Sequence, residues 1–326
     1  MIDSHTGGEP FRVVIDGLPE IPGDTVLDRR RYAMAHLDDL RRALMWEPRG
    51  HADMYGGWVG PPIEQGSDLS VLFTHNEGFS TMCGHGIIAL AKVAFDTGII
   101  TTRQTDCGLT IDTPAGTIHS TSIVNERGVT ATTFRNVPSF ALLLDREVEV
   151  AGYGTIRFDV GFGGAFYAVV DAMALGLHLD DAAALIAAGG AIKQAVADSE
   201  VISHPEHEDL GFLYGVIFTG PGIGSEAHSR NVCVFADGEV DRSPTGTGVS
   251  ARLALLHARG EVGVGEDIVI ESIVGSAFTG RIAATTTSGP HSAIIPEVTG
   301  SAHILGRSEF WLDPTDPLSS GFLIRS

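Results

Sequence analysis

The chain has 326 residues, 43% of them hydrophobic, with 21 basic and 41 acidic side chains and a formal net charge of −20. This length and composition can supply a large core and suggest about two domains. The negative charge disfavours phosphate backbones and anionic membrane surfaces, so we expect neither a nucleic acid nor a membrane as partner, although a local pocket can still bind a small anion.

The cysteines and the first residues indicate the compartment. Cys83, Cys107 and Cys233 are too few and too scattered for a disulfide framework, and they fit a reducing environment. The opening residues, MIDSHTGGEP, lack a basic region followed by an apolar one, so we expect no signal peptide. No apolar run approaches the ~20 residues of a membrane-spanning helix. We therefore expect a cytoplasmic protein.

Short runs rich in Val, Ile, Thr and Phe, bounded by Gly, Asp or Asn, dominate the chain and predict strands. In chain order they are residues 11–17, 70–75, 108–124, 128–140, 156–171, 212–220, 231–238, 267–275 and 278–287. Apolar residues at helical spacing predict helices over 28–46, 86–98, 180–199 and 248–260. Many strands with few helices favour an α+β fold over a parallel βαβ fold.

One short sequence occurs twice. STMCGHGIIALA, residues 80–91, returns about 160 residues later as SPTGTGVSARLA, residues 243–254, with Thr245 in the place of Cys83. Each copy opens a predicted helix, and each helix ends at a glycine, Gly98 in the first and Gly260 in the second. We interpret this as an internal duplication that gives two similar lobes, each with one central helix.

The start of each repeated helix is suited to binding an anion. A helix N-terminus has unpaired N–H groups and partial positive charge, and glycines let a ligand approach the backbone. Such a turn fits a carboxylate, and its field lowers the pKa of a thiol placed there, which is Cys83. The plain alternative is two ordinary capped helices with a buried cysteine. The repetition at a matched position favours a functional role.

Five segments together resemble the proline racemase family, which includes 4-hydroxyproline 2-epimerase and trans-3-hydroxy-L-proline dehydratase. They are IDSHTGGEP (2–10), EPRGHADMYG (47–56), NEGFSTMCGHG (76–86), GGAFYAVVDA (163–172) and DRSPTGTGVSAR (241–252). The resemblance implies an α+β fold like that of diaminopimelate epimerase, with two pseudo-symmetric lobes and the active site between them. Each lobe is then a mostly antiparallel β-barrel around a central helix. We expect residues 1–145, with 310–326 packing back on them, to form the first lobe and 146–309 the second.

The resemblance also assigns the reacting groups. Racemases of the family place one cysteine from each lobe on opposite faces of the substrate Cα. Cys83 matches the first cysteine, but the second falls at Thr245, a pair similar to that of the trans-3-hydroxy-L-proline dehydratases. An alcohol ionises far above a thiol, so Thr245 is a poor acid or base at neutral pH. The expected reaction is therefore removal of the Cα proton by Cys83 and loss of water from Cβ, which yields Δ1-pyrroline-2-carboxylate.

Further residues take roles by position in the resemblance. Thr245 would hydrogen-bond the departing hydroxyl directly or through water. The substrate-binding residues would be Gly84 and His85 through the turn, Asp241 at the ring amine, Gly246 and Thr247 at the carboxylate through their N–H groups, and Tyr55 as an aromatic wall. The resemblance implies no cofactor, and it makes a homodimer plausible by analogy.

Other chemistry is less well supported. The spacing of His75, Cys83 and His85, with His51 nearby in sequence, matches no common zinc pattern. A Cys83–His85 ion pair for covalent catalysis is conceivable, but residues two apart at a helix start do not reliably face each other. The glycines at 161–164 lack the full dinucleotide fingerprint, and no Walker lysine is present.

The other two cysteines have a structural interpretation. Cys107 and Cys233 lie in β-like runs and are expected to be buried. Cys233 is the fallback thiol if its side chain faces the cleft.

Two alternatives to the dehydratase remain open. The first is a proline or hydroxyproline racemase or 2-epimerase that uses Thr245 as a relay. The second is a non-catalytic protein that binds imino acids. A dehydratase forms an imine and an epimerase forms inverted substrate, whereas a binding protein does neither and is only stabilised by the ligand.

Overall fold

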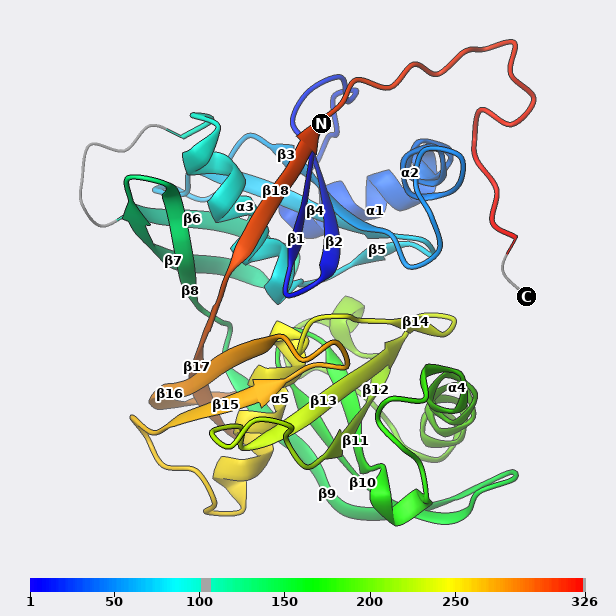
Figure 1. Ribbon diagram of the computed structural model, residues 1–326, viewed down its shortest axis with the longest axis vertical. Coiled ribbons are helices and arrows are strands. Elements are labelled where there is room, and N and C mark those ends of the chain that lie inside the picture. The colour runs from blue at the N-terminus through cyan, green and yellow to red at the C-terminus, as the bar shows by residue number, and fades with distance from the viewer. Residues whose placement is uncertain (101–106, 325–326) are drawn as a thin grey trace. The chain divides into compact units, whose positions relative to one another are not determined.

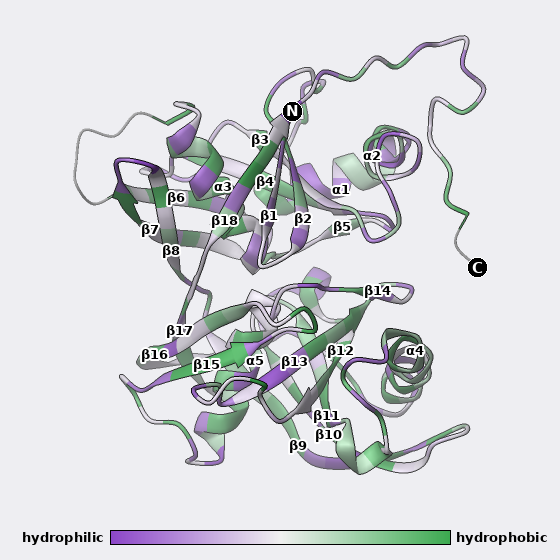
Figure 2. Ribbon diagram, viewed as in Figure 1, coloured by the Kyte–Doolittle hydropathy of each residue, from purple (hydrophilic) through white to green (hydrophobic). Residues whose placement is uncertain are grey.

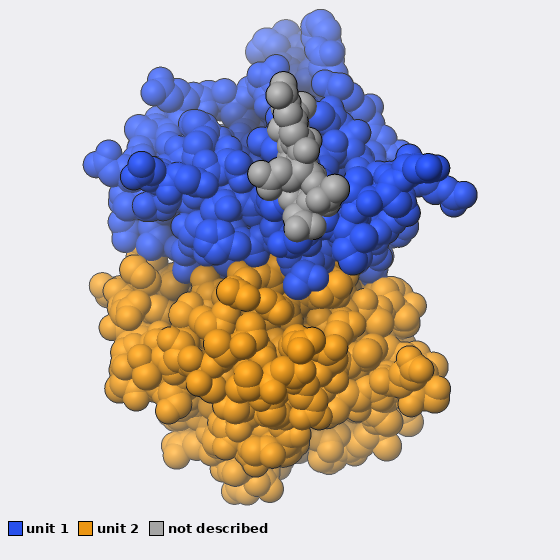
Figure 3. All heavy atoms as spheres, turned by 90° about the vertical axis from the view of Figure 1, so that its left-hand side faces the viewer, with its two compact units in different colours: residues 1–133, 301–326 blue, residues 134–300 orange. Residues whose placement is uncertain are grey.

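The computed structural model describes residues 1–100 and 107–324 and divides into two compact units, shown in Figures 1 and 3. Unit 1 contains residues 1–133 and 301–326, and unit 2 contains residues 134–300. The sequence expectation placed the boundaries after residues 145 and 309. Residue 145 lies inside strand β9 (Ser139–Val150), which belongs wholly to unit 2.

Unit 1 contains a run of paired strands and three helices within its described residues. The strands pair in the order β18 (Ala302–Arg307), β1 (Ile2–Thr6), β2 (Glu9–Val14), β3 (Tyr55–Gly60), β4 (Leu69–His75), β6 (Cys107–Thr113) and β7 (Gly116–Asn125). The β2–β3 and β4–β6 pairs are parallel, and the other pairs are antiparallel. The short β5 (Phe79–Ser80) pairs with β4, and β8 (Gly128–Arg135) leads into unit 2. The helices are α1 (Val26–His36), α2 (Asp38–Met45) and α3 (Gly84–Asp96).

Unit 2, described in full from residue 134 to residue 300, contains a closed barrel of eight strands. They pair in the order β9, β10 (Gly154–Phe162), β11 (Phe166–Asp171), β12 (Leu213–Gly220), β13 (Ser229–Phe235), β15 (Asp267–Glu271), β16 (Ala277–Ser288) and β17 (His291–Gly300). The ring closes because β17 pairs with β9. The short β14 (Glu239–Val240) pairs with the end of β13. The helices are α4 (Ala182–Ser199) and α5 (Gly246–Ala258), with 3-10 turns η1 (Met173–Leu175) and η2 (Glu208–Leu210).

The two units repeat one strand order. The pairs β11–β12 and β13–β15 are parallel in unit 2, and they correspond to β2–β3 and β4–β6 in unit 1. The second parallel pair starts at Leu69 opposite Ile111 in unit 1 and at Ser229 opposite Ile270 in unit 2, so Leu69 and Ser229 are equivalent positions. The expected α+β fold, with mostly antiparallel strands around a helix, is confirmed.

A helix occupies the centre of each repeat. Helix α5 contacts β9, β10, β16 and β17 of the closed barrel, and its residues are buried without a break from Gly246 to Leu256. A helix buried on every face lies inside a core rather than on a surface. Helix α3 is buried from Gly84 to Ala94 apart from Lys92, and it contacts β1, β2 and β18. Both helices are followed by a glycine at φ +74°, Gly98 and Gly260, which confirms the predicted helix ends.

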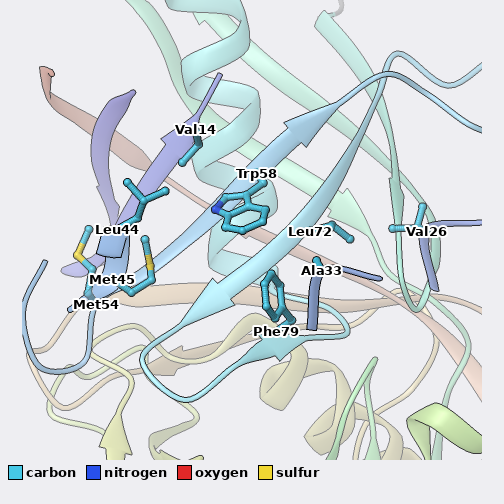
Figure 4. Packing of buried hydrophobic residues seen from close by; sticks show 9 residues of the cluster. All are labelled: Val14, Val26, Ala33, Leu44, Met45, Met54, Trp58, Leu72 and Phe79. Atoms are coloured by element: carbon cyan, nitrogen blue, oxygen red, sulfur yellow. The ribbon is translucent and has the colours of Figure 1, made fainter. Parts of the chain in front are cut away.

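The expectation of a single helix over 28–46 is wrong, because the chain breaks at Leu37. The Leu37 backbone (φ −127°, ψ 15°) ends α1 and begins α2. The break lets Leu37 pack on the unit 1 cluster of Figure 4, in which Trp58 meets Phe79 edge to face at 5.3 Å. It also places the buried Arg41 side chain so that it donates to the carbonyl of His75 at 2.7 Å.

Three of the predicted strand runs are divided in the structure. The run 108–124 turns back between Thr113 and Gly116 and gives the antiparallel pair β6 and β7. The run 128–140 breaks before Pro138, which has no N–H for a strand ladder, and gives β8 and β9. The run 156–171 turns back at Gly164, at φ +101°, and gives the hairpin of β10 and β11. Within the described residues, no helix is long and apolar enough to cross a membrane.

Candidate active site

The first helix start places the Cys83 thiol at the N-cap of α3. Its extended backbone (φ −145°, ψ 104°) brings the sulfur 3.2 Å from the backbone nitrogen of Gly86, which donates to it. The side chain is 4% exposed. A sulfur at the positive end of a helix, with an N–H directed at it, is better stabilised as a thiolate than as a thiol.

His85 and Tyr55 lie beside this thiol. The Nδ1 atom of His85 is 3.3 Å from the sulfur of Cys83, so these side chains face each other despite their spacing of two. The imidazole meets Tyr55 edge to face at 4.9 Å and Phe11 at 5.6 Å. Thr6 donates its hydroxyl to the carbonyl of His85 at 2.9 Å. Unit 1 therefore brings together its predicted site residues Cys83, Gly84, His85 and Tyr55.

The second helix start differs from the first at the equivalent residue. Thr245 is the N-cap of α5, but its φ is +66° and its side chain makes no capping bond. A β-branched residue at positive φ is a true outlier that costs about 1–3 kcal/mol. The side chain is 6% exposed, and its hydroxyl has no hydrogen-bond partner among the described residues. The fold therefore holds Thr245 with a strained backbone and with a hydroxyl that makes no hydrogen bond to the described residues.

Asp241 takes part in the turn that leads to Thr245. Its Oδ1 accepts from the N–H of Ser243 at 2.7 Å, and the hydroxyl of Ser243 accepts from the N–H of Thr245 at 3.1 Å. A buried turn aspartate commonly satisfies backbone donors in this way. Asp241 is 4% exposed and shapes the same turn that carries Thr245.

Gly246 and Thr247 form the first turn of α5. The Thr247 hydroxyl hydrogen-bonds the hydroxyl of Tyr167 at 2.7 Å. Burial raises the pKa of Tyr167 well above its ordinary value, so the phenol stays neutral. A side chain at Gly163 would clash with the carbonyl oxygen of Thr247, so the tight β10–β11 turn requires glycine there. Unit 2 therefore brings together its predicted residues Asp241, Thr245, Gly246 and Thr247.

The chemistry available at the two helix starts is unequal. Both offer first-turn N–H groups that can bind a carboxylate. Only α3 adds a thiol and an imidazole able to accept a proton, whereas α5 adds a neutral hydroxyl. Cys107 and Cys233 are buried thiols within β6 and β13. Across residues 1–100 and 107–324, no group of three or more His, Cys, Asp or Glu side chains is arranged to hold a metal ion.

Several residues that shape the two turns were not predicted. Thr6, Phe11 and Tyr167 lie in segments that were recognised only as strands or family motifs, and contacts distant in sequence bring them to the helix starts. The hydroxyl of Ser250 donates to the carbonyl of Gly246 at 3.0 Å within α5. A serine one turn into a helix whose other residues are mostly apolar was the available sequence clue.

Comparisons with known proteins agree over almost the whole chain. A family model described as proline racemase matches residues 1–323. The chain is 45% identical to a trans-3-hydroxy-L-proline dehydratase from Colwellia psychrerythraea, over 99% of this chain and 92% of that protein. It is 43% identical to a 3-hydroxyproline 2-epimerase from Burkholderia multivorans, over 99% of this chain and 97% of that protein. The structure of a hydroxyproline epimerase from Agrobacterium vitis with bound trans-4-hydroxy-L-proline superposes with a TM-score of 0.94 at 32% identity, covering 99% of this chain and 94% of that one.

Proposed function

This chain belongs to the proline racemase family, and from that premise we propose that it is a cofactor-independent dehydratase of trans-3-hydroxy-L-proline. The observation that carries the proposal is the residue at the start of α5. There, Thr245 presents a hydroxyl where the equivalent residue of α3, Cys83, presents a thiol. A relative of 45% identity that bears this activity in its name supports the same reading.

In the proposal, Cys83 is the base. Its thiolate removes the Cα proton, helped by the Gly86 N–H that already donates to the sulfur and by His85 at 3.3 Å. Positioned acid–base groups of this kind contribute about 10²–10⁴-fold to a rate. Thr245 has no comparable acidity and does not return a proton to the opposite face.

The loss of water then follows from the substrate. The electrons of the Cα–H bond form a Cα–Cβ double bond while the Cβ–O bond breaks, and the hydroxide leaves as water with a proton from solvent. Thr245 donates its hydroxyl hydrogen bond to the departing oxygen. The enamine moves its N–H proton to Cβ and becomes the cyclic imine Δ1-pyrroline-2-carboxylate. Cys83 returns its proton to solvent, so the net change is the loss of one water.

The remaining residues bind the substrate. The first-turn N–H groups of Gly246 and Thr247 receive the carboxylate, because a helix start has unpaired donors there. Asp241 accepts from the protonated ring amine. Gly84 and His85 contact the substrate from the α3 turn, and Tyr55 forms a wall beside the ring.

A 2-epimerase is the second candidate, favoured by the 43% identical relative named 3-hydroxyproline 2-epimerase. That reaction requires a proton to be delivered to the face opposite Cys83. Thr245 would then relay a proton from another donor. The two candidates share the first step and differ only in the fate of the carbanion-like state.

The experiment is an incubation of the purified protein with trans-3-hydroxy-L-proline, trans-4-hydroxy-L-proline and L-proline in parallel. An imine-trapping reagent detects the dehydration product, and chiral chromatography detects inversion. The proposal predicts imine from the 3-hydroxy substrate alone. Inversion without imine would establish the epimerase instead, and no conversion at all would contradict both.

A matched pair of cysteine variants tests the base. Cys83→Ser should lower imine formation by at least about 10²-fold, because a serine hydroxyl is a far weaker base than a thiolate. Cys107→Ala, at another buried thiol, should keep nearly full activity. An active Cys83→Ser variant would show that the base is wrongly assigned.

A further inference from the structure

Unit 2 buries three polar side chains against its central helix, Ser229 and Asn231 of β13 and Arg252 of α5, here called the polar trio. The Nη1 atom of Arg252 donates to the hydroxyl of Ser229 at 2.6 Å and to Oδ1 of Asn231 at 2.9 Å. Asn231 is fully buried, and Ser229 and Arg252 are 7% and 8% exposed. Figure 2 shows the hydrophilic start of β13 within an otherwise apolar strand.

The equivalent positions of unit 1 hold no counterpart of this trio. The paired registers make Ser229 equivalent to Leu69, and the aligned helix starts make Thr245 equivalent to Cys83. By the same offsets, the residues of unit 1 that occupy the trio's positions are Leu69, Val71 and Leu90. All three are buried aliphatic side chains. The repeat therefore folds with an apolar core at these positions, so folding alone does not require the trio.

Burying the polar trio also lowers the stability of the fold. Arg252 forms no salt bridge within the described residues, and the side chains that accept its hydrogen bonds are neutral; Glu261 contributes only a Coulombic attraction. Burial lowers the pKa of Arg252 to about 10, so the guanidinium stays charged at neutral pH. A buried charge without an ionic partner in hydrogen-bond contact lowers stability unless its hydrogen bonds serve a role that an apolar side chain cannot fill.

The trio reaches the site through one peptide bond. The Nδ2 atom of Asn231 donates to the carbonyl of Pro244 at 3.2 Å. On the other side of the same peptide unit, the N–H of Thr245 donates to the hydroxyl of Ser243 at 3.1 Å. The carbonyl of Thr245 accepts from the N–H of Val249 at 2.7 Å as α5 begins. The peptide plane before Thr245 and the helix after it are both held, and these two constraints define its φ of +66°.

We infer that Asn231, oriented by Arg252, is a positioning residue that holds Thr245 in its left-handed backbone conformation and so aims the Thr245 hydroxyl at the substrate. This rests on the proposed function for its catalytic consequence but not for its structural one. At the equivalent place in unit 1, Val71 and Leu90 offer no donor, and Cys83 has an ordinary extended backbone at φ −145°.

A stability comparison tests the structural half without any substrate. At positive φ glycine is favoured over alanine, whereas at negative φ alanine is favoured. Thr245→Gly should therefore melt above Thr245→Ala when the trio is intact. Adding Asn231→Asp keeps a partner for Arg252 but removes the donor to Pro244, so the order of the two melting temperatures should reverse. An order that does not reverse would overturn the inference.

An activity comparison tests the catalytic half. Asn231→Asp should lower kcat for dehydration by about 10²-fold, as misplacement of a reacting group by about 1 Å does, with KM little changed. Exchange of the substrate Cα proton for deuterium, which needs Cys83 but not Thr245, should persist. If exchange and dehydration fell together, the damage would be general and the inference would be wrong.

Further variants separate a loss of positioning from general damage to the protein. Arg252→Leu, which introduces the unit 1 residue, should reproduce the effect of Asn231→Asp. Arg281→Leu, at an exposed position of β16, should change neither readout. In a Thr245→Ala background, Asn231→Asp should cause no additional loss of dehydration; an additive loss would argue against positioning. If the wild-type protein forms no imine, the proposed function fails, and the melting order still decides the inference.

Discussion

The backbone nitrogen of Gly86 lies 3.2 Å from the sulfur of Cys83 and donates a hydrogen bond to it. The same glycine has no room for a side chain. A Cβ there would lie 2.6 Å from the ring of Phe11 and 2.9 Å from the sulfur of Cys83. Because Phe11 is fully buried, the thiol is the group that would move.

Gly86→Ala should therefore displace the thiol and lower dehydration by at least about 10²-fold. Overpacking should also lower the free energy of unfolding by about 1–3 kcal/mol. The matched control is Gly190→Ala in α4, where no heavy atom lies within 4 Å of the new Cβ. The control should gain about 0.5–1 kcal/mol of stability and keep its activity, as measured by denaturant unfolding and imine trapping.

The bond between Tyr167 and Thr247 should behave as a coupled pair. Tyr167→Phe leaves the buried Thr247 hydroxyl without this partner and should cost about 1–3 kcal/mol of unfolding free energy. Thr247→Val alone should cost a similar amount, and the double variant should lose less than the sum. Strictly additive losses in this cycle would mean that the bond does not stabilise the start of α5.

His204 makes unit 2 sensitive to acid. Its ring packs on Phe162 at 4.8 Å, and burial lowers its pKa from 6.5 to about 4, with His207 and His291 adding to the shift and Glu206 opposing it. Between pH 6.5 and about 4, His204 is protonated in the unfolded chain but neutral in the folded one. The free energy of unfolding therefore falls as the pH is lowered from 6.5 toward 4.

His204→Asn should remove part of this acid sensitivity. Asparagine retains an acceptor for the N–H groups of Glu206 and His207, which now donate to Nδ1 of His204. The control is His178→Asn at an exposed site, whose stability profile should follow the wild type. Thermal melts across this pH range measure the effect, and an unchanged slope in His204→Asn would contradict it.

The sequence predicted the helix starts because their determinants are local. Cys83 and Thr245 precede matched glycines, and Gly98 and Gly260 can adopt positive φ without strain. Strand β17 was not recognised, and the predicted run 128–140 reached only the first two residues of β9, because the pairing that joins these strands and closes the barrel is a contact between distant segments. Strand β3 was also not predicted. Its sequence, YGGWVG, contains three glycines, so it forms a strand only because it pairs with neighbouring strands.

The geometry of Thr245 could not be predicted from the repeated sequence. The match with the first copy suggested an ordinary N-cap, but the structure holds Thr245 at positive φ. The causes lie in Ser243 and in Asn231, which is fourteen positions away and reached only through the barrel. The residues of the candidate site were therefore predictable as types and positions, whereas the strain at the second helix start was not.

Thr245→Cys should change part of the dehydratase activity into epimerase activity. A second thiol supplies the acid that the threonine hydroxyl lacks, so the variant should invert trans-4-hydroxy-L-proline, while dehydration falls at least about tenfold. Thr245→Ser, which keeps a hydroxyl, should gain no inversion. Chiral chromatography of the recovered substrate measures both variants, and inversion by Thr245→Ser would show that the thiol is not the deciding group.

The most direct test of the central claim, that one thiol acts on one face of the substrate, is the stereochemistry of unreacted substrate in D2O. Wild-type protein is incubated with trans-3-hydroxy-L-proline and stopped before completion. The account predicts imine and recovered substrate with its original configuration, any deuterium at Cα having entered with retention. Recovery of the inverted diastereomer with deuterium at Cα would mean that a second acid serves the opposite face and would contradict the account.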